Sequence, residues 1–317
     1  MARDKRKIKP STIIISIIFI CSIATFSYFI IENYNSYNKE LKNQENLNSE
    51  ISKLTQTSDE ITEKQNNILK EKDDLENIDN TINDIKKEVF SLASELENKI
   101  KNGESNKKIA YLTFDDGPYY STDRVLSILK EYKIKATFFT IGLDKDICYD
   151  NRNYSCAETY KKEVDAGHTI ANHTYSHAIF NGLYTGVDSF MNQVKLQEEL
   201  IENRTGVKTN ILRFPGGSAT VSALAGVYAK NTIIERLKEN GYGWVDWTAQ
   251  DGDGGNLTDY STGWRNFTGS INDNIEVVLF HDYNNVTISL LPEAIEYLQN
   301  NDYILLPLFY DSVMVNK

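Results

Sequence analysis

The chain contains 317 residues, enough for one or two domains, and carries a net charge of -11 at pH 7. This acidic balance argues against nucleic acid as a partner, because phosphate binding requires a basic surface. All 17 glycines lie at Gly103 or later, and neither glycine nor proline occurs between Pro10 and Gly103. Residues 11–102 can therefore run as uninterrupted helix, whereas residues 108–317, about 210 in number, can form one sizeable core.

The chain begins with a basic segment, residues 1–12, which is followed by an apolar one. Residues 13–31 carry no charged side chain and are long enough to cross the ~30 Å hydrocarbon core of a membrane as a helix. The basic flank is expected to stay in the cytoplasm, which places everything after residue 31 outside. A cleaved signal peptide is the alternative, but the apolar run is longer than a typical signal core and no clear cleavage site follows it. We therefore expect a single-pass membrane anchor.

Residues 32–107 are rich in Asn, Lys, Glu and Asp and are expected to form a helical stalk and a linker. Apolar residues recur at every seventh position from Leu47 to Leu96. A second apolar series consists of Ile78, Ile85 and Leu92. This alternation indicates a coiled-coil seam, through which two chains can associate. A single solvated helix is the alternative, because the second seam position is polar between Leu54 and Leu75.

Two cysteines, Cys148 and Cys156, lie in the polar stretch 146–158. If this part of the chain is outside the cell, a disulfide would close that loop. Two free thiols are the alternative, because the sequence does not provide the geometry that a disulfide requires. The pair lacks the additional nearby ligands that would indicate a metal site.

Within residues 108–317, short β-rich runs alternate with amphipathic stretches. The expected strands are 109–114, 136–141, 167–171, 211–214, 243–247, 276–280 and 303–308. The expected helices are 125–132, 160–166, 189–204, 233–240 and 291–299. Repeated strand–helix units predict an α/β fold with a parallel sheet. The polar motifs lie where strands end, which is where a barrel of this kind builds its active site.

The first polar motif, Thr-Phe-Asp-Asp-Gly-Pro, contains Asp115 and Asp116 at the end of a strand. Successive side chains diverge on an extended backbone, so one carboxylate can bind a metal while its neighbour faces a substrate. A plain turn is the alternative interpretation of this motif alone. His173 and His177 form the second motif, and their spacing places both imidazoles on one face of a helical turn. His168, in the preceding strand, is interpreted as structural.

Three further strand ends carry polar residues. His281 follows an apolar run and is placed to donate a proton. Arg213 precedes a Gly-rich turn that contains Gly216, and it can pair with a carboxylate. Asp246 lies between two tryptophans. Each of these three, taken singly, is more typical of a structural residue than of a catalytic one.

The five motifs TFDDGP, NHTYSH, RFPGG, WVDW and LFHD occur in the order found in the polysaccharide deacetylases, the NodB-homology domain of carbohydrate esterase family four. The resemblance covers about residues 108–310. It implies a distorted (β/α) barrel of NodB-homology type that removes acetyl groups from glycans. It also implies one divalent metal ion, zinc or alternatively cobalt or another transition metal.

Matched position by position, the resemblance implies that Asp116, His173 and His177 hold the metal. Asp115 would be the general base and His281 the general acid. The remaining motif residues would support these two. Arg213 would orient Asp115, Asp246 would hold His281, and Leu279 would line the acetyl pocket. Gly216 departs from the family pattern, which usually has an aromatic residue there; its N–H can still bind an oxyanion, but one wall of the glycan groove would be missing.

These observations predict a membrane-anchored, extracytoplasmic deacetylase, with residues 1–12 as a cytoplasmic tail, 13–31 as the anchor, 32–107 as stalk and linker and 108–317 as the catalytic domain. The favoured substrate is the N-acetylglucosamine of peptidoglycan, because the anchor makes the envelope the nearest glycan. A secreted polysaccharide such as poly-N-acetylglucosamine is the alternative substrate. A non-catalytic carbohydrate-binding module and a zinc-binding regulator are alternatives of another class. Either of these protein classes would tolerate the loss of Asp115 and His281. Because both residues are present, the sequence favours an enzyme.

Overall fold

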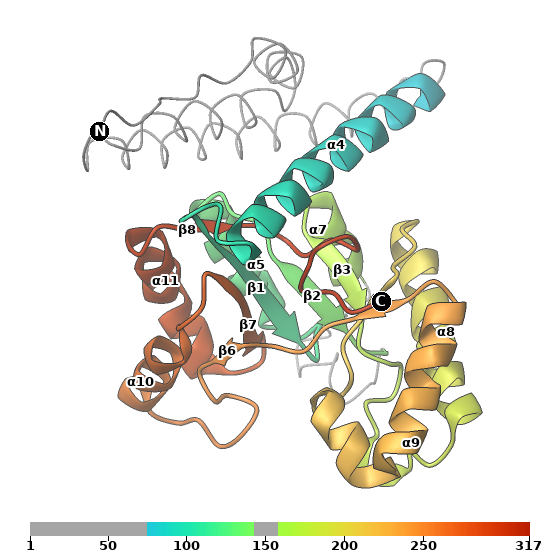
Figure 1. Cartoon of the computed structure of the whole chain (residues 1–317). Helices are drawn as coiled ribbons and strands as arrows, with labels where there is room; N and C mark the ends of the chain where they lie inside the picture. The colour runs from blue at the N-terminus through green and yellow to red at the C-terminus, as the bar shows by residue number, and fades with distance from the viewer. Residues whose placement is uncertain (1–74, 143–157) are drawn as a thin grey trace. The chain divides into compact units, whose positions relative to one another are not determined.

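The structure is a computed structural model that describes residues 75–142 and 158–317 (Figure 1). The expected membrane anchor, most of the expected stalk, Cys148 and Cys156 lie outside these residues. Within the two described ranges, no helix is long and apolar enough to cross a membrane. Residues Leu96–Lys317 form one compact unit, which is described below.

A curved sheet of eight parallel strands forms the centre of this unit. Its strands are β1 (Lys108–Asp115), β2 (Thr137–Thr140), β3 (Thr169–Asn172), β4 (Ile211–Leu212), β5 (Gly243–Trp244), β6 (Ala249–Gln250), β7 (Ile275–His281) and β8 (Tyr303–Leu305). They follow the order β5-β4-β3-β2-β1-β7-β6, and β8 pairs with the start of β1. Among the described residues no ladder joins β5 to β6, so the curved sheet is an open barrel. The predicted α/β class with a parallel sheet is confirmed.

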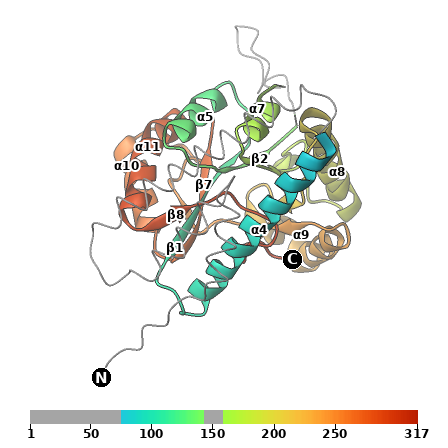
Figure 2. The ribbon, with the colours of Figure 1, turned by 90° about the horizontal axis from the view of Figure 1, so that it is seen from above.

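Helices connect the strands and cover the outside of the sheet. They are α5 (Thr122–Glu131), α7 (Thr159–Asp165), α8 (Val187–Thr205), α9 (Gly217–Glu239), α10 (Tyr260–Ser270) and α11 (Asn285–Asn300), together with the short 3-10 helix η2 (Ile179–Asn181). Helix α4 (Leu75–Lys101) precedes β1 and connects no strands. Figure 2 shows α11, α5, α7 and α8 arranged around the strands. This arrangement is expected for a parallel sheet, because its crossover connections place helices on the outer face.

The sequence analysis missed β6, α10 and the first two thirds of α9. The α10 segment contains two glycines and several β-branched or polar residues, which have low helix propensity. The Asp259 side chain nevertheless caps this helix by accepting a hydrogen bond from the Thr262 N–H. In α9, Gly226 interrupts the helical backbone with a φ of 86°. The β6 strand has only two residues and therefore has no readable periodicity.

The two central strands, β1 and β7, place the candidate base and the candidate acid side by side. Strand β7 is buried over its whole length and β1 over all but its first residue, because helices cover them. Phe114 of β1 packs against Phe280 of β7 and Phe138 of β2, and Phe280 also packs against Phe267 of α10. The β1–β7 register places Asp115 directly beside His281. The polar residues therefore begin where both strands leave the core.

A buried carboxylate, Glu97, attaches the end of α4 to the compact unit. The Glu97 side chain is fully buried and accepts hydrogen bonds from the Tyr111 hydroxyl, from Ser312 Oγ at 2.6 Å and from the Val313 N–H at 2.9 Å. These bonds connect the helix to β1 and to the C-terminal segment. Burial raises the pKa of Glu97, although the three donors act in the opposite direction.

Replacing Glu97 with alanine is expected to destabilise the protein by about 3 kcal/mol or more, because it leaves two buried donors and one part-buried donor without a partner. Urea unfolding followed by tryptophan fluorescence measures the change. The exposed Glu235, changed to alanine, is the matched control and is expected to shift stability by less than about 0.5 kcal/mol. Equal effects of the two substitutions would show that Glu97 is not an anchor.

Candidate active site

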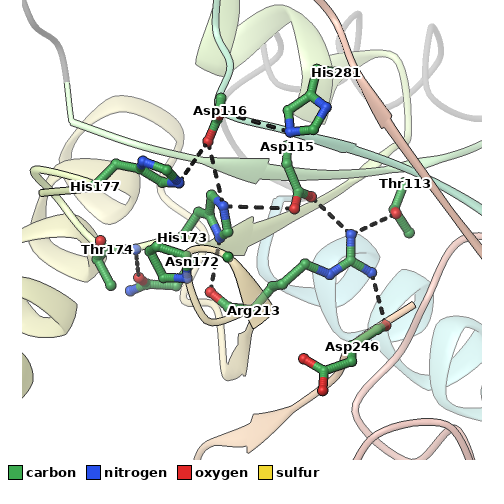
Figure 3. Close-up of polar contacts among 12 residues, drawn as sticks. Thr113, Asp115, Asp116, Asn172, His173, Thr174, His177, Arg213, Asp246 and His281 are labelled. Carbon is green, nitrogen blue, oxygen red and sulfur yellow. Dashed lines mark hydrogen bonds and ion pairs between the residues drawn. The ribbon is translucent and has the colours of Figure 1, made fainter. Parts of the chain in front are cut away.

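The polar motif residues meet at the carboxyl edge of the sheet (Figure 3). Asp115 ends β1 and Asp116 follows it, His173 follows β3, Arg213 follows β4, and His281 ends β7. Because all these strands are parallel, their ends lie on one edge. Six of the residues that the sequence analysis singled out are brought together there. They are Asp115, Asp116, His173, His177, Arg213 and His281.

Asp116, His173 and His177 form a candidate metal site. Their ligand atoms all lie within 4.8 Å of one another. Asp116 Oδ1 is 3.4 Å from His173 Nε2 and 3.2 Å from His177 Nε2, and it is buried without a hydrogen-bond partner. One carboxylate and two imidazoles are a ligand set that suits zinc and leaves a position for substrate. The residues present therefore fit a divalent ion.

The two histidines lie on a loop, so the predicted helical turn is wrong. After β3 the backbone enters the left-handed region at Thr174 (φ 66°) and again at His177 (φ 49°). The Asn172 side chain supports this loop by accepting a bond from the Thr174 N–H at 2.8 Å and donating one to the Val194 carbonyl at 2.8 Å. The loop brings the imidazole centroids to 5.0 Å. A four-residue spacing brings the two rings together in a helical turn and also in this loop, so the spacing of His173 and His177 alone cannot distinguish the two structures.

Hydrogen bonding sets the tautomer of His173. Its Nδ1 lies 2.8 Å from the Arg213 carbonyl and so must carry the proton, which leaves the Nε2 lone pair directed at Asp116. Burial acts to raise the pKa of Asp116, but the contact with His173 and the charges of His177 and His281 lower it below its usual range. The carboxylate is therefore ionised and available as a ligand.

Asp115 is held by Arg213, as predicted. Arg213 Nη1 donates to Asp115 Oδ1 at 2.8 Å and to Thr113 Oγ1 at 2.7 Å. The same guanidinium donates to the carbonyls of Val245 and Asp246, at 3.3 and 3.2 Å. Asp115 Oδ2 lies 3.6 Å from His173 Nε2. One Asp115 oxygen is thus bound by the arginine, and the other faces the candidate metal site.

The predicted pair of Asp246 and His281 is wrong. Asp246 Oδ1 accepts from the Ser218 N–H at 2.9 Å and Oδ2 from Ser218 Oγ at 2.6 Å, so this carboxylate lies at the N-terminus of α9. His281 is held instead by Asp253, whose Oδ1 lies 2.7 Å from His281 Nδ1 and whose Oδ2 accepts from the His281 N–H at 2.6 Å.

Asp253 was missed because β6 was missed. Strand β6 pairs with β7, so the acid that reaches His281 comes from the loop after β6 and not from the segment after β5. The signal in the sequence is an acid followed by glycines, Asp253-Gly254-Gly255. A side chain at Gly254 would place its Cβ 3.1 Å from His281 Cε1, which is tighter than an ordinary contact, so glycine there gives the imidazole room. Burial acts to lower the pKa of His281, but the bond to Asp253 raises it to about 9.

The other predicted residues occupy supporting positions. Leu279 is buried in β7, on the same face of the strand as His281. Gly216 has a φ of 73° at the start of α9, and a Cβ there would lie 3.3 Å from Ile179 Cδ1. His168 Nδ1 accepts a bond from the Ala136 N–H at 3.1 Å, and burial lowers its pKa to about 3, which agrees with a structural role.

The site is most open beside the candidate metal ligands. The side chains of His177 and Asp116 are 26% and 17% exposed, whereas that of His173 is 2% exposed. A substrate can therefore approach the group from the side of His177 and Asp116.

Comparison with known proteins agrees with this geometry. Residues 102–241 match the family model described as polysaccharide deacetylase. Two solved structures are similar over most of their own length. The catalytic domain of peptidoglycan N-acetylglucosamine deacetylase from Eubacterium rectale is 30% identical, with a TM-score of 0.59 over 67% of this chain and 93% of that one. A polysaccharide deacetylase from Bacillus cereus is 26% identical, with a TM-score of 0.56 over 65% and 94%.

Curated relatives have similar names. A bifunctional xylanase/deacetylase from Pseudobutyrivibrio xylanivorans is 30% identical over 62% of this chain, and a peptidoglycan-N-acetylglucosamine deacetylase from Bacillus cereus is 31% identical over 48%. The matched regions span 29% and 51% of the lengths of these two relatives. With the matching family model, the shared fold and the arrangement of the motifs, these similarities show that the chain belongs to the polysaccharide deacetylase family.

Proposed function

We propose that the protein is a metal-dependent deacetylase that removes N-acetyl groups from the N-acetylglucosamine of peptidoglycan and releases acetate. The observation that carries the proposal is the position of Asp115, an Arg-bound carboxylate 3.6 Å from a candidate metal ligand and outside the ligand set itself. An acid held in this way can accept a proton from water, which a carbohydrate-binding module would not require.

The metal would be held by Asp116 Oδ1, His173 Nε2 and His177 Nε2. When bound, a divalent ion supplies Lewis acidity to the acetyl carbonyl and to the attacking water. The protein contributes the ligand orientation, because the Arg213 carbonyl sets the His173 tautomer and Asn172 supports the loop that carries both histidines.

Asp115 acts as general base. Its Oδ1 is bound by Arg213, which keeps the carboxylate in one orientation and leaves Oδ2 to accept the proton of water as it attacks the acetyl carbon. Because the arginine also bonds Thr113 and two carbonyls, the base cannot rotate away without breaking a buried network.

His281 acts as general acid. The amine of the sugar is a poor leaving group and must be protonated as the C–N bond breaks. Asp253 accepts the Nδ1 proton of His281, so Nε2 is the nitrogen that faces the site, 3.7 Å from Asp116 Oδ2. The raised pKa keeps His281 protonated at neutral pH, which is the state that an acid requires.

The proposed substrate is supported by the comparisons, and the proposed location by the N-terminal sequence. Peptidoglycan is favoured by the names of the relatives from Eubacterium rectale and Bacillus cereus. The apolar segment 13–31 supports a membrane anchor with the catalytic domain outside the cytoplasm, and the heptad pattern of the stalk supports self-association. A secreted poly-N-acetylglucosamine is the second candidate substrate, and comparing acetate release from the two glycans separates them.

The wild-type chain is expected to release acetate from N-acetylated muropeptides, with the loss located by mass spectrometry on the glucosamine ring. Asp115→Asn is expected to lower kcat by about 10²- to 10⁴-fold, because the base is lost while the metal ligands remain. Equal acetate release by the variant would contradict the mechanism. Faster release from poly-N-acetylglucosamine than from muropeptides would favour the second substrate.

Removal of metal with a chelator is expected to abolish acetate release, and added zinc is expected to restore it. Asp116→Asn is expected to weaken zinc binding by at least about tenfold, as measured by competition with a chromogenic chelator. The control is Asp188→Asn, because the Asp188 side chain is 89% exposed and lies outside the site. Full activity in the chelated protein would exclude metal dependence.

Asp253→Asn is expected to shift the alkaline limb of the kcat profile to lower pH by about one unit or more. The bond to Asp253 raises the pKa of His281 to about 9, so its loss lets the imidazole deprotonate at lower pH. Asp246→Asn is the matched control, because Asp246 bonds Ser218 and not His281. If the alkaline limb shifted in Asp246→Asn and not in Asp253→Asn, Asp246 and not Asp253 would be the partner of His281.

A further inference from the structure

A second buried carboxyl group lies behind Asp253. Asp251 is fully buried at the end of β6, and Thr287 projects toward it from the first turn of α11. Thr287 Oγ1 lies 2.7 Å from Asp251 Oδ2 and 2.9 Å from Asp253 Oδ2. Asp251 Oδ1 accepts a bond from the Asp253 N–H at 3.1 Å. The proposed mechanism does not use Asp251 or Thr287.

The number of hydrogens in this group limits its protonation state. A threonine hydroxyl has one hydrogen, but Thr287 Oγ1 is within hydrogen-bond distance of oxygens from two carboxyl groups. If both groups were ionised, one short contact would place a hydroxyl lone pair against a carboxylate. A second hydrogen removes this conflict, so the geometry favours a proton on one of the two carboxyl groups.

The hydrogen-bond partners indicate which group carries the proton. Asp253 accepts two short bonds from His281, at 2.6 and 2.7 Å, and donors of this kind stabilise a carboxylate. Asp251 accepts one longer bond, from a backbone N–H, in addition to its contact with Thr287. The negative charge therefore belongs on Asp253 and the proton on Asp251.

We propose that Asp251 is a positioning residue that is held protonated and donates to Thr287, which in turn donates to Asp253 Oδ2 and orients that carboxylate against His281. Asp251 and Thr287 do not touch the substrate. They act on the general acid through Asp253. This inference rests on the proposed function for its activity measurements, but the protonation of Asp251 can be tested without them.

The charges around Asp251 agree with a neutral acid. Burial raises the pKa of Asp251 to about 7, and the neighbouring charge of Asp253 acts in the same direction. His281, from β7, lies beyond Asp253. Helix α11 presents the Thr287 hydroxyl, and α10 presents the Asn266 amide, which bonds the Asp251 carbonyl at 3.0 Å. Arg265 of α10 is exposed and bonds Thr262.

The first test compares two substitutions of Asp251 in the full chain. An asparagine amide can donate to Thr287 as the protonated acid does, so Asp251→Asn is expected to keep kcat within about threefold of wild type at about pH 6. Asp251→Ala is expected to lower kcat about tenfold or more, with KM unchanged. A tenfold loss in Asp251→Asn at this pH, with its unfolding midpoint unchanged, would overturn the proposal.

The ratio of the kcat of Asp251→Asn to the kcat of wild type should depend on pH. As pH rises through the pKa of Asp251, the wild-type acid ionises and the hydroxyl of Thr287 can turn away from Asp253, whereas asparagine cannot ionise. The kcat of Asp251→Asn relative to wild type is therefore expected to rise by about threefold or more between about pH 6 and about pH 8.5. A constant ratio would overturn the proposal.

Stability provides a measurement that does not need activity. An acid whose pKa is raised from about 4 in the unfolded chain to about 7 in the folded protein binds more protons when folded. Wild type should therefore lose stability between about pH 4 and about pH 7 relative to Asp251→Asn, with no further loss above that range. Urea midpoints that stay parallel over the whole range would show that Asp251 is ionised, even if the proposed function were wrong.

Thr287 provides a second pair of variants, in case Asp251→Asn does not fold. Thr287→Ser keeps the hydroxyl and is expected to retain kcat within about threefold, whereas Thr287→Val is expected to lower kcat about tenfold at constant KM. Equal kcat values for serine and valine would remove Thr287 from the proposed chain of hydrogen bonds. Absence of activity in wild type would contradict the proposed function and leave the urea result to decide the state of Asp251.

Discussion

The guanidinium of Arg213 is wholly buried, and a buried positive charge is tolerated only where an opposite charge and hydrogen bonds compensate its loss of hydration. Here the compensation comes from the ends of two strands. Thr113 and Asp115 belong to β1, and the carbonyls of Val245 and Asp246 follow β5. The carbonyl of Arg213 itself accepts the bond from His173. One buried residue thus sets the orientation of the candidate base and the tautomer of a candidate metal ligand.

Two adjacent aspartates acquire different roles because their surroundings differ. Asp115 is the last residue of an extended strand and pairs with the arginine, whereas Asp116 has a φ of 70° and turns toward the two imidazoles. The left-handed conformation of Asp116 directs its side chain to the opening of the site. Asp115 is bound by a guanidinium and is therefore held next to the candidate metal site as a base. Asp116 faces two imidazole nitrogens and can bind an ion together with them.

The supporting charges follow the same division. The candidate base is held by a cation, Arg213, and the candidate acid by an anion, Asp253. Partners of opposite charge allow one site to hold a base and an acid side by side. The loop after β6 contributes a second buried acid, Asp251, which accepts a bond from the Asp253 N–H and shares the Thr287 hydroxyl with Asp253.

Most of the site could be predicted from the sequence, because motif residues at the ends of parallel strands meet at one edge whatever the details of packing. Asp115, Asp116, His173, His177, Arg213 and His281 were found in this way. The prediction that Asp246 holds His281 was wrong, because a correct prediction required knowing which strand pairs with β7. That neighbour is β6, a strand of two residues that pattern analysis cannot detect.

The sequence by itself determined which residue types end the strands, since buried parallel strands read as apolar runs and the first polar residue after each run marks the edge of the sheet. Only the tertiary structure decided which of these residues touch. Strand order, the left-handed turns at Asp116 and His177, and the contact of Asp253 with His281 arise from packing between segments far apart in the chain. Local patterns carry no information about such contacts, because hydrogen bonds between distant segments form only after the sheet has brought them together.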